Sequence, residues 1–423
     1  MDVQTRSLGP WGPAAWRVAL GLVLLLALVL RLKGIHDPLL DHPGWRQGDT
    51  GAIARNFALL QFDILHPQTN YNGPPPNYVE LELQIVPFLA ATFYKIFGVH
   101  EIFGRFISIA FSLGTVAVLA YFGRWLFAGE LAGIFSALLF AIMPGSVYYG
   151  RTFMPDTAML FFLTAALYAI ARFAVEDEAM GNRALGRSTA LLTMAFLAKP
   201  VSLAGLIPVG ILFAERARAG RTLRWLRLGV LVIVPLALLW AYDRTVASYA
   251  EWHWASGITK LHVLPALVAS LEHADAFRIK ILYLKQMLGV LAVNVCGPFP
   301  FAIAIAGLFF LPRVTRSRSL LWGWVAGGLL YTYVVVTVER VDYYMLLLLP
   351  PLALAGGAAV ARLAGALTAS ALSRAYKYAL AIAGVLILAG AIFQDRSIVA
   401  PYYRYNPQVY RNAIALDATL PAG

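Results

Sequence analysis

The chain has a single cysteine and few charged residues. Cys296 is the only cysteine among 423 residues, which excludes an intrachain disulfide and any metal site built from several cysteines. The seven histidines are scattered and form no close metal-ligand pattern. Only 13% of the residues are charged, and no internal repeat, low-complexity tract or soluble domain stands out. These absences argue against a disulfide-stabilised, zinc-stabilised or solenoid protein.

Hydrophobic residues make up 60% of the sequence, far more than in an ordinary soluble domain. A spanning helix needs roughly 20 mostly apolar residues, and windows that meet or nearly meet this length recur along the chain. The first window is followed by no small-residue cleavage site, so we expect it to be retained. We predict an all-α polytopic membrane protein with about eleven spanning helices, near residues 14–33, 105–123, 130–148, 157–174, 188–198, 201–214, 226–242, 284–311, 320–338, 342–362 and 377–393.

The basic residues behind the net charge of +12 are distributed as this topology requires. With a cytoplasmic N-terminus, every connector rich in Arg or Lys falls on one side, including 172–187, 216–227, 313–318 and 362–377. That is the positive-inside distribution, so the basicity does not indicate a nucleic-acid partner. We therefore expect a multi-pass protein of the inner (plasma) membrane, embedded in the lipid bilayer, with a functional site that faces the periplasm or exterior.

The predicted organisation is one transmembrane module, residues 1–393, followed by an outer tail, 394–423. Its two large outer loops are 34–104 and 243–283. Within the first, residues 83–97 are apolar, but a span there would invert every later loop, so we predict an interfacial amphipathic helix. The two arms around Lys199 are too short to span fully, and we expect them to dip around a polar cavity.

The most informative outer segment is Asp41-His42-Pro43-Gly44-Trp45-Arg46-Gln47-Gly48-Asp49-Thr50, directly after the first predicted helix. Ionisable residues beside membrane segments are functional candidates because they are costly there. Asp49 has two open interpretations: an N-cap of a helix over 50–60, or a functional carboxylate in the company of Trp45, Arg46 and Gln47.

Other candidates lie in the remaining outer loops, and each keeps a structural alternative. Asp156 is suited to cap the N-terminus of a helix or to pair with Arg151. Arg105 is suited to extend its side chain along the membrane interface. Lys199 needs an anionic partner, whether a ligand or a carboxylate. Arg340 can pair with its neighbours Glu339 and Asp342. The remaining candidates for substrate contact are two interfacial aromatics and two acids of the first loop, Tyr343, Tyr344, Glu80 and Glu82.

Together these outer residues suit a substrate that carries a phosphate. Cations bind the phosphate and stabilise charge that develops on it as a leaving group, and a carboxylate accepts a proton from an incoming hydroxyl. Sequence position alone does not establish that these groups converge.

The chain resembles the GT-C fold glycosyltransferases of the family 39 type, which include protein O-mannosyltransferases and the aminoarabinose transferase that acts on lipid A. The resemblance covers about residues 14–360. It rests on the early acid Asp49, the stretch Gly98 to Arg105 with Ser108, the loop Arg151 to Asp156, Ala198-Lys199-Pro200, and Tyr343-Tyr344 followed by Leu349-Pro350-Pro351.

The resemblance implies a polyprenyl-phosphate-linked sugar as donor and transfer with inversion at the anomeric carbon. It implies Asp49 as the general base, with Lys199, Arg105, Arg151 and Arg340 as phosphate contacts, and no obligatory metal or other cofactor. Thr50 follows Asp49 where the protein O-mannosyltransferases have Glu, and the outer loops are short. These departures favour a lipid-linked or cell-envelope glycan acceptor over a folded protein.

Two other functions remain open from the sequence. A transporter or flippase for lipid-linked sugars would also need outer cations and broken helices, although such proteins usually show repeats. A non-catalytic partner in an envelope-glycan assembly complex is the third hypothesis.

Overall fold

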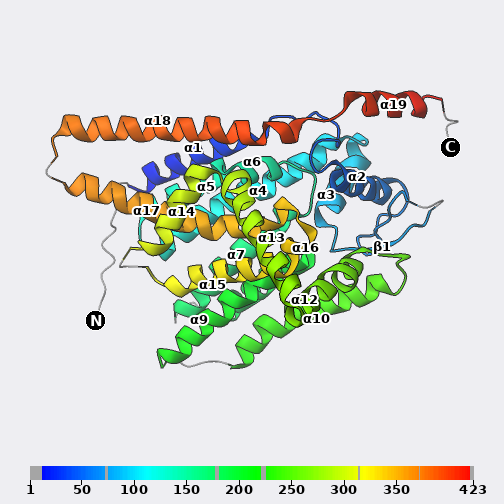
Figure 1. The fold of residues 1–423 in the computed structure, drawn as a ribbon, viewed down its shortest axis with the longest axis horizontal. Helices are drawn as coiled ribbons and strands as arrows, with labels where there is room; N and C mark the ends of the chain where they lie inside the picture. Colours follow the sequence, from blue (N-terminus) through cyan, green and yellow to red (C-terminus); the bar gives the residue numbers. More distant parts are fainter. Residues whose placement is uncertain are drawn as a thin grey trace.

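The structure is a computed structural model that describes residues 12–71, 75–176, 181–220, 225–312, 315–370 and 372–419. Parts of the basic connectors, such as 221–224 and 313–314, and the last residues of the tail, 420–423, lie outside the described residues. The described chain is a helical bundle with its loops gathered at two ends. Figure 1 shows α2, α3 and β1 at the right-hand end, whereas the C-terminal end of α17 and the N-terminal end of α18 lie at the left.

The first half of the bundle runs from α1 to α9. Its elements are α1 Pro13–Arg31, α2 Gly44–Leu59, β1 Val79–Glu80, α3 Ile85–Phe97, α4 Glu101–Leu126, α5 Glu130–Ile142, α6 Pro144–Tyr149, α7 Asp156–Val175, α8 Asn182–Ala198, the 3-10 helix η2 Pro200–Gly205 and α9 Leu206–Arg218.

The second half contains three π-helical segments and a long terminal helix. Its elements are α10 Trp225–Ala247, β2 Trp252–His253, α11 Trp254–Gly257, η3 Ile258–Val263, α12 Leu264–Glu272, α13 Ala274–Val290, η4 Leu291–Val295, α14 Pro298–Phe309, α15 Arg318–Tyr331, η5 Thr332–Val336, α16 Thr337–Glu339, η6 Asp342–Leu348, α17 Leu349–Ala369, α18 Arg374–Val399, η7 Ala400–Tyr403 and α19 Pro407–Asp417.

The described residues contain eight helical stretches long and apolar enough to cross a membrane, and a bent pair would make nine. The expected membrane-protein class and helical fold are confirmed, but the predicted count of eleven is not. The eight stretches are Pro13–Arg31, Glu101–Leu126, Asp156–Val175, Pro200–Arg218, Trp225–Ala247, Arg318–Glu339, Asp342–Leu367 and Arg374–Leu416.

Several predicted helices differ in length or are broken. The segment expected as one span over 284–311 consists of Ala274–Val295 and Pro298–Phe309, bent by 114°. Gly297, with φ +86°, and Pro298 lie at the break, and neither continues a helix readily. The span expected over 130–148 is likewise divided before Pro144.

Other boundaries move outward because polar residues extend the helices. Residues 201–214, expected as a short arm, belong to the full-length stretch Pro200–Arg218, and the arm expected over 188–198 begins at Asn182. Helix α18 continues to Val399, past the predicted end of the last helix at residue 393. The helix expected over 83–97 is present as α3, packed against α2 and α4.

The core of the bundle is packed through small residues. A Cβ atom added to Gly133 of α5 would lie 2.3 Å from the carbonyl oxygen of Ala120 in α4. A Cβ on Gly307 of α14 would lie 2.1 Å from the carbonyl oxygen of Ala355 in α17. Glycine at these positions lets the helices approach closely, which is how helices associate in a membrane.

At the loop end, strand pairing brings distant segments together. The two-residue strands β1 and β2 pair in parallel, with Val79 opposite Trp252 and Glu80 opposite His253. This pairing holds the segment from α11 to α12 beside the first loop, which contains α2. The C-terminal segment also reaches this end, where the backbone N–H of His42 donates to the carbonyl of Tyr402 over 3.0 Å.

Candidate functional site

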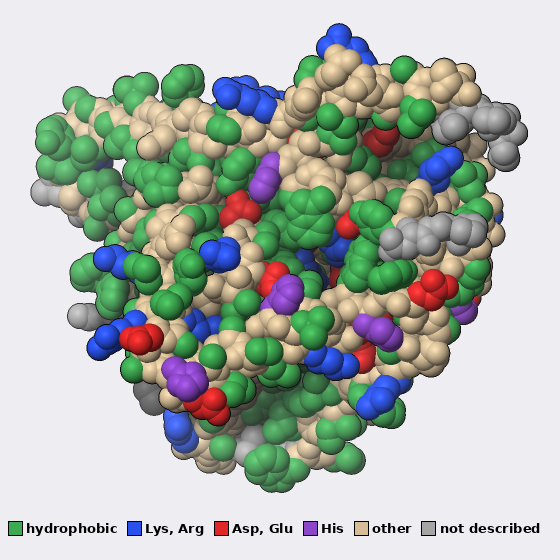
Figure 2. Space-filling view, turned by 45° about the vertical axis from the view of Figure 1, so that its right-hand side comes forward, with side chains coloured by type: hydrophobic (Ala, Val, Ile, Leu, Met, Phe, Trp, Pro, Cys, Tyr) green, Lys and Arg blue, Asp and Glu red, His purple; other side chains and the backbone are tan. Residues whose placement is uncertain are grey.

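A cavity of about 850 Å³ opens at the loop end of the bundle. Its polar end is lined by Trp45, Arg46, Asp49, Tyr71, Glu82, Lys199, Tyr343 and Tyr344. The remaining wall is largely apolar and includes Val201, Leu203, Ala204, Ile258, Leu261, Val263, Leu264, Val334 and Val335. Figure 2 shows a hollow near the middle of this face, with basic and acidic side chains inside it and histidines nearby. The cavity therefore combines a charged end with a hydrophobic wall.

Asp49 lies on α2 and faces this cavity. The helix begins at Gly44, so Asp49 is inside it, and the expected N-cap position at the start of a helix over 50–60 is wrong. Trp45 and Arg46 precede Asp49 by four and three residues, so both lie about one turn before it on the same side of the helix. That spacing explains why all three line the same cavity.

The Asp49 carboxylate is 6% exposed and accepts a hydrogen bond at Oδ1 from the hydroxyl of Tyr71. In the described part of the chain its Oδ2 atom receives no hydrogen bond. Burial raises the pKa of Asp49, while the bond from Tyr71 and the charge of Arg46 oppose this rise. A raised carboxyl pKa makes the carboxylate a stronger base.

Two cations lie beside this carboxylate, and each has an acidic partner. Arg46 forms an ion pair with Glu82, whose side chain is also nearly buried. The Lys199 ammonium lies 2.7 Å from Oδ1 of Asp156. It also lies over the rings of Tyr343 and Tyr344, 5.1 Å and 4.8 Å from their centroids. A carboxylate thus holds each cation at the polar end of the cavity, and two aromatic faces add to the contacts of Lys199.

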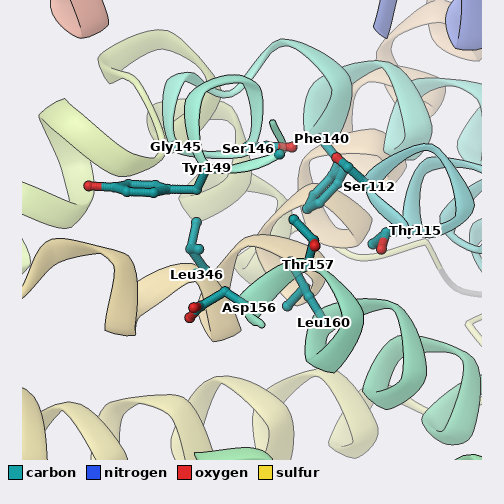
Figure 3. A pocket seen from close by; sticks show the side chains of 11 residues that line it. Ser112, Thr115, Phe140, Gly145, Ser146, Tyr149, Asp156, Thr157, Leu160 and Leu346 are labelled. Atoms are coloured by element: carbon teal, nitrogen blue, oxygen red, sulfur yellow. The ribbon is translucent and has the colours of Figure 1, made fainter. Parts of the chain in front are cut away.

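Asp156 connects Lys199 to the bundle interior. Its side chain makes no N-cap hydrogen bond, so the capping interpretation is wrong, and Arg151 pairs elsewhere. Figure 3 shows Asp156 and Thr157 with Ser112, Thr115 and Ser146 around a small cavity of about 10 Å³. Oδ2 of Asp156 has no hydrogen-bond partner among the described residues.

Arg105 and Arg151 form a separate cluster around Asp41. Both guanidinium groups are fully buried and bind Asp41, with Arg105 Nη2 lying 3.1 Å from Oδ1. Both also donate to the carbonyl of Gly34, over 2.5 Å and 3.2 Å. Neither lines the 850 Å³ cavity. The structure therefore places these two predicted phosphate contacts outside the cavity.

Gln47 and Glu80 also lie outside it. Gln47 donates to Asp41 Oδ1 over 2.8 Å and accepts from the backbone N–H of Phe153 over 3.2 Å, which fixes α2 to the loop before α7. Glu80 accepts from the Ser256 hydroxyl over 2.7 Å and lies 3.3 Å from His253. These contacts position α2 and α11.

Arg340 lines a second, smaller cavity of about 350 Å³. The residues of that cavity are His42, Pro43, Trp45, Gln286, Met287, Val290, Arg340, Val341, Asp342 and Tyr343. Pairing of Arg340 with Glu339 and Asp342 is not observed among the described residues. Glu339 pairs with His262 over 3.0 Å, and Asp342 accepts from Tyr149 and Tyr402.

Several residues of the large cavity have no distinguishing signal in the sequence. Tyr71 binds Asp49, yet nothing in the local sequence distinguishes it from the other interfacial tyrosines. The wall formed by residues 253–264 is brought in by the pairing of β2 with β1, a contact between strands of two residues that leaves no pattern in the sequence. Val334 and Val335 come from the π-helical segment η5.

No group of three or more His, Cys, Asp or Glu side chains within the described ranges is close enough to hold a metal ion. Whether the protein needs a metal therefore remains a prediction about activity, and a chelator tests it.

Residues 84–240 match the family model described as dolichyl-phosphate-mannose-protein mannosyltransferase, which is less than half of the chain. No curated protein sequence is significantly similar to the chain.

Solved structures share the fold over nearly the whole chain. ArnT from Cupriavidus metallidurans is 17% identical in the apo state, with a TM-score of 0.60 over 92% of this chain and 74% of that chain. The same protein bound to undecaprenyl phosphate gives a TM-score of 0.56 over 93% and 74%. The archaeal oligosaccharyltransferase AglB from Archaeoglobus fulgidus, in complex with an inhibitory peptide and a dolichol-phosphate, is 15% identical, with a TM-score of 0.55 over 96% and 58%.

At these identities the likeness to solved structures establishes the fold alone. The chain therefore has the GT-C fold and resembles the glycosyltransferases that share it.

Proposed function

We propose that the protein transfers a sugar from a polyprenyl-phosphate-linked donor to a hydroxyl group of a lipid-linked or cell-envelope glycan, on the outer face of the membrane. One observation carries the proposal: the Asp49 carboxylate and the cations Arg46 and Lys199 line one cavity whose remaining wall is largely apolar. A lipid-phosphate sugar has the matching parts, a polar sugar phosphate and a hydrocarbon chain.

The donor fits this cavity in one orientation. Its phosphate lies at the polar end beside Lys199 and Arg46, where charge-assisted hydrogen bonds are strong. Its prenyl chain follows the apolar wall toward the lipid. The chemistry agrees with the names of the structural neighbours, which were solved with undecaprenyl phosphate and dolichol-phosphate.

The reaction is a direct displacement. The acceptor oxygen attacks the anomeric carbon and loses its proton to Asp49, while the bond between the anomeric carbon and the phosphate oxygen breaks. The polyprenyl phosphate leaves with the bonding electrons, and Lys199 and Arg46 stabilise its added negative charge. Attack opposite the leaving group inverts the anomeric configuration.

The test measures transfer by purified protein from an undecaprenyl-phosphate sugar to a cell-envelope glycan. We expect Asp49→Asn, which keeps the shape of the side chain but removes the base, to lower the rate roughly 100-fold or more. Asp63→Asn is a matched control, because Asp63 lies in the same loop and pairs with His66 outside the cavity.

Full activity of the Asp49→Asn variant would contradict the catalytic role of this residue. Movement of the lipid-linked sugar across a bilayer by the wild type, without transfer, would instead support a flippase.

A further inference from the structure

We propose that the 350 Å³ cavity, termed the second cavity, binds the acceptor, and that the acceptor is an anionic saccharide bearing a carboxylate or phosphate. The inference rests on the proposed function and names the substrate class of the same site.

The second cavity adjoins the large cavity at α2. Trp45 and Tyr343 line both cavities, whereas Asp49 lines the large one. Trp45 lies one helical turn before Asp49, so both side chains project from the same face of α2. A saccharide held against Trp45 in the second cavity therefore lies next to the helical face that carries Asp49.

The cation of the second cavity is available to a ligand. Arg340 is exposed, and its guanidinium lies over the ring of Tyr283, 4.8 Å from the centroid. No carboxylate of the described residues lies within ion-pair distance of it. This distinguishes Arg340 from Arg46, Arg105, Arg151 and Lys199, each of which already binds an acid.

The backbone turns at Arg340. Its φ is +52°, in the left-handed region, where residue 340 ends the short helix α16. Glycine adopts this region readily, so a glycine at position 340 keeps the backbone and removes only the side chain that lines the second cavity.

The acid in the second cavity is already engaged. Asp342 accepts hydrogen bonds from the Tyr149 hydroxyl (2.7 Å), the Tyr402 hydroxyl (2.6 Å) and the backbone N–H of Tyr343 (2.9 Å). His42 lies 3.6 Å from the same carboxylate. These donors occupy both oxygens of Asp342 and stabilise its charged form, so Arg340 is the group of this cavity that remains to bind an anion.

The size and surface of the cavity match a saccharide. Its volume lies within the usual range for small-molecule sites, which have an apolar lining and a few directed polar groups. Trp45 is 62% exposed and offers an aromatic face to a sugar ring, and Gln286 adds a side-chain amide.

The test titrates the full-length protein in detergent with three probes, D-glucuronate, D-glucose 6-phosphate and D-glucose, by saturation-transfer NMR. Undecaprenyl phosphate is present throughout so that it occupies the large cavity. We expect one or both anionic sugars to bind at least about tenfold more tightly than glucose, because a guanidinium binds an anion through charge-assisted hydrogen bonds. The two anionic probes distinguish a carboxylate from a phosphate.

Two variants at one position separate binding from folding. Arg340→Gln removes the charge, and Arg340→Gly removes the side chain while relieving the left-handed backbone. Both should abolish the preference for anions and leave binding of undecaprenyl phosphate within about twofold. Lys199→Gln should weaken binding of undecaprenyl phosphate and leave the preference for anions unchanged. Arg278→Gln, at an exposed arginine of α13 outside both cavities, should change neither the lipid binding nor the anion preference.

Equal binding of all three sugars would overturn the proposal. So would an anion preference that survives both Arg340 variants, or one that Arg278→Gln removes to the same extent. Failure of undecaprenyl phosphate to bind the wild type would overturn the proposed function instead, and an anion preference at Arg340 would then describe a binding site without a transfer role.

Discussion

Two clusters at the loop end contain the same kinds of residue and differ in what surrounds them. In the first, Asp41 binds Arg105 and Arg151, and all three side chains are fully buried. In the second, Asp49 lies with Arg46 and Lys199 around an open cavity. The first cluster has no space for a ligand, so it fixes the loop, whereas the second can accept one.

The difference shows why charge alone does not locate a site. Both oxygens of Asp41 are occupied by protein donors, including Gln47 and the two arginines. Asp49 has a single described donor, Tyr71, and one carboxylate oxygen that faces space. Buried charges must be paired, and an unpaired carboxylate is tolerated only where solvent or substrate reaches it.

Removing the acid of the buried cluster should give the largest effect. Asp41→Asn leaves two fully buried guanidinium groups without a counter-charge, which we expect to destabilise the fold by about 3–5 kcal/mol. The midpoint of thermal unfolding in detergent measures this. Asp49→Asn should change the midpoint little, because its partner is a neutral tyrosine. Equal destabilisation by the two variants would contradict the comparison.

Removing the cation of the open cluster should impair transfer beyond its effect on stability. We expect Lys199→Gln to lower kcat/KM roughly 100-fold, because the leaving phosphate loses a positive contact. The substitution also leaves Asp156 without its partner. The double variant Lys199→Gln with Asp156→Asn should therefore recover stability and remain inactive. Recovery of transfer in the double variant would show that Lys199 acts only by neutralising Asp156.

The hydrogen bond from Tyr71 should lower the pKa of Asp49. It stabilises the charged form of Asp49 and so lowers the pKa that burial raises. Tyr71→Phe removes this bond, and the pKa of Asp49 should rise further. Because transfer needs the carboxylate, the acidic limb of the pH–kcat profile should move to higher pH. An unchanged acidic limb would mean that another group limits the rate.

A chelator should have the smallest effect. Since protein cations are proposed to stabilise the leaving phosphate, we expect transfer to stay within about twofold after dialysis against EDTA. A loss that added Mg²⁺ or Mn²⁺ restores would show that a metal shares this task.

The sequence identified those residues of the site whose place beside an apolar segment marks them as candidates. The placement of Asp49 after the first apolar helix, and of Lys199 between two apolar segments, led to two groups that line one cavity. Trp45, Arg46, Glu82, Tyr343 and Tyr344 lie there as well. The fold class followed from hydrophobic length and the distribution of basic residues, because these patterns are local.

The sequence did not reveal contacts between residues that lie far apart along the chain. Arg105 and Arg151 both bind Asp41, which lies 64 and 110 positions away from them in the sequence. The wall formed by residues 253–264 depends on a strand pair of two residues. Arg340 lines the second cavity and not the large one, although Trp45 and Tyr343 line both. No local period or motif encodes these contacts.

Asp49 is proposed to act on the proton of the acceptor and not on the binding of the donor. The most direct measurement compares undecaprenyl phosphate binding with single-turnover transfer in the Asp49→Asn variant. We expect binding within about twofold of the wild type and transfer reduced roughly 100-fold or more. Normal transfer by this variant, or a loss of transfer fully explained by lost lipid binding, would contradict it.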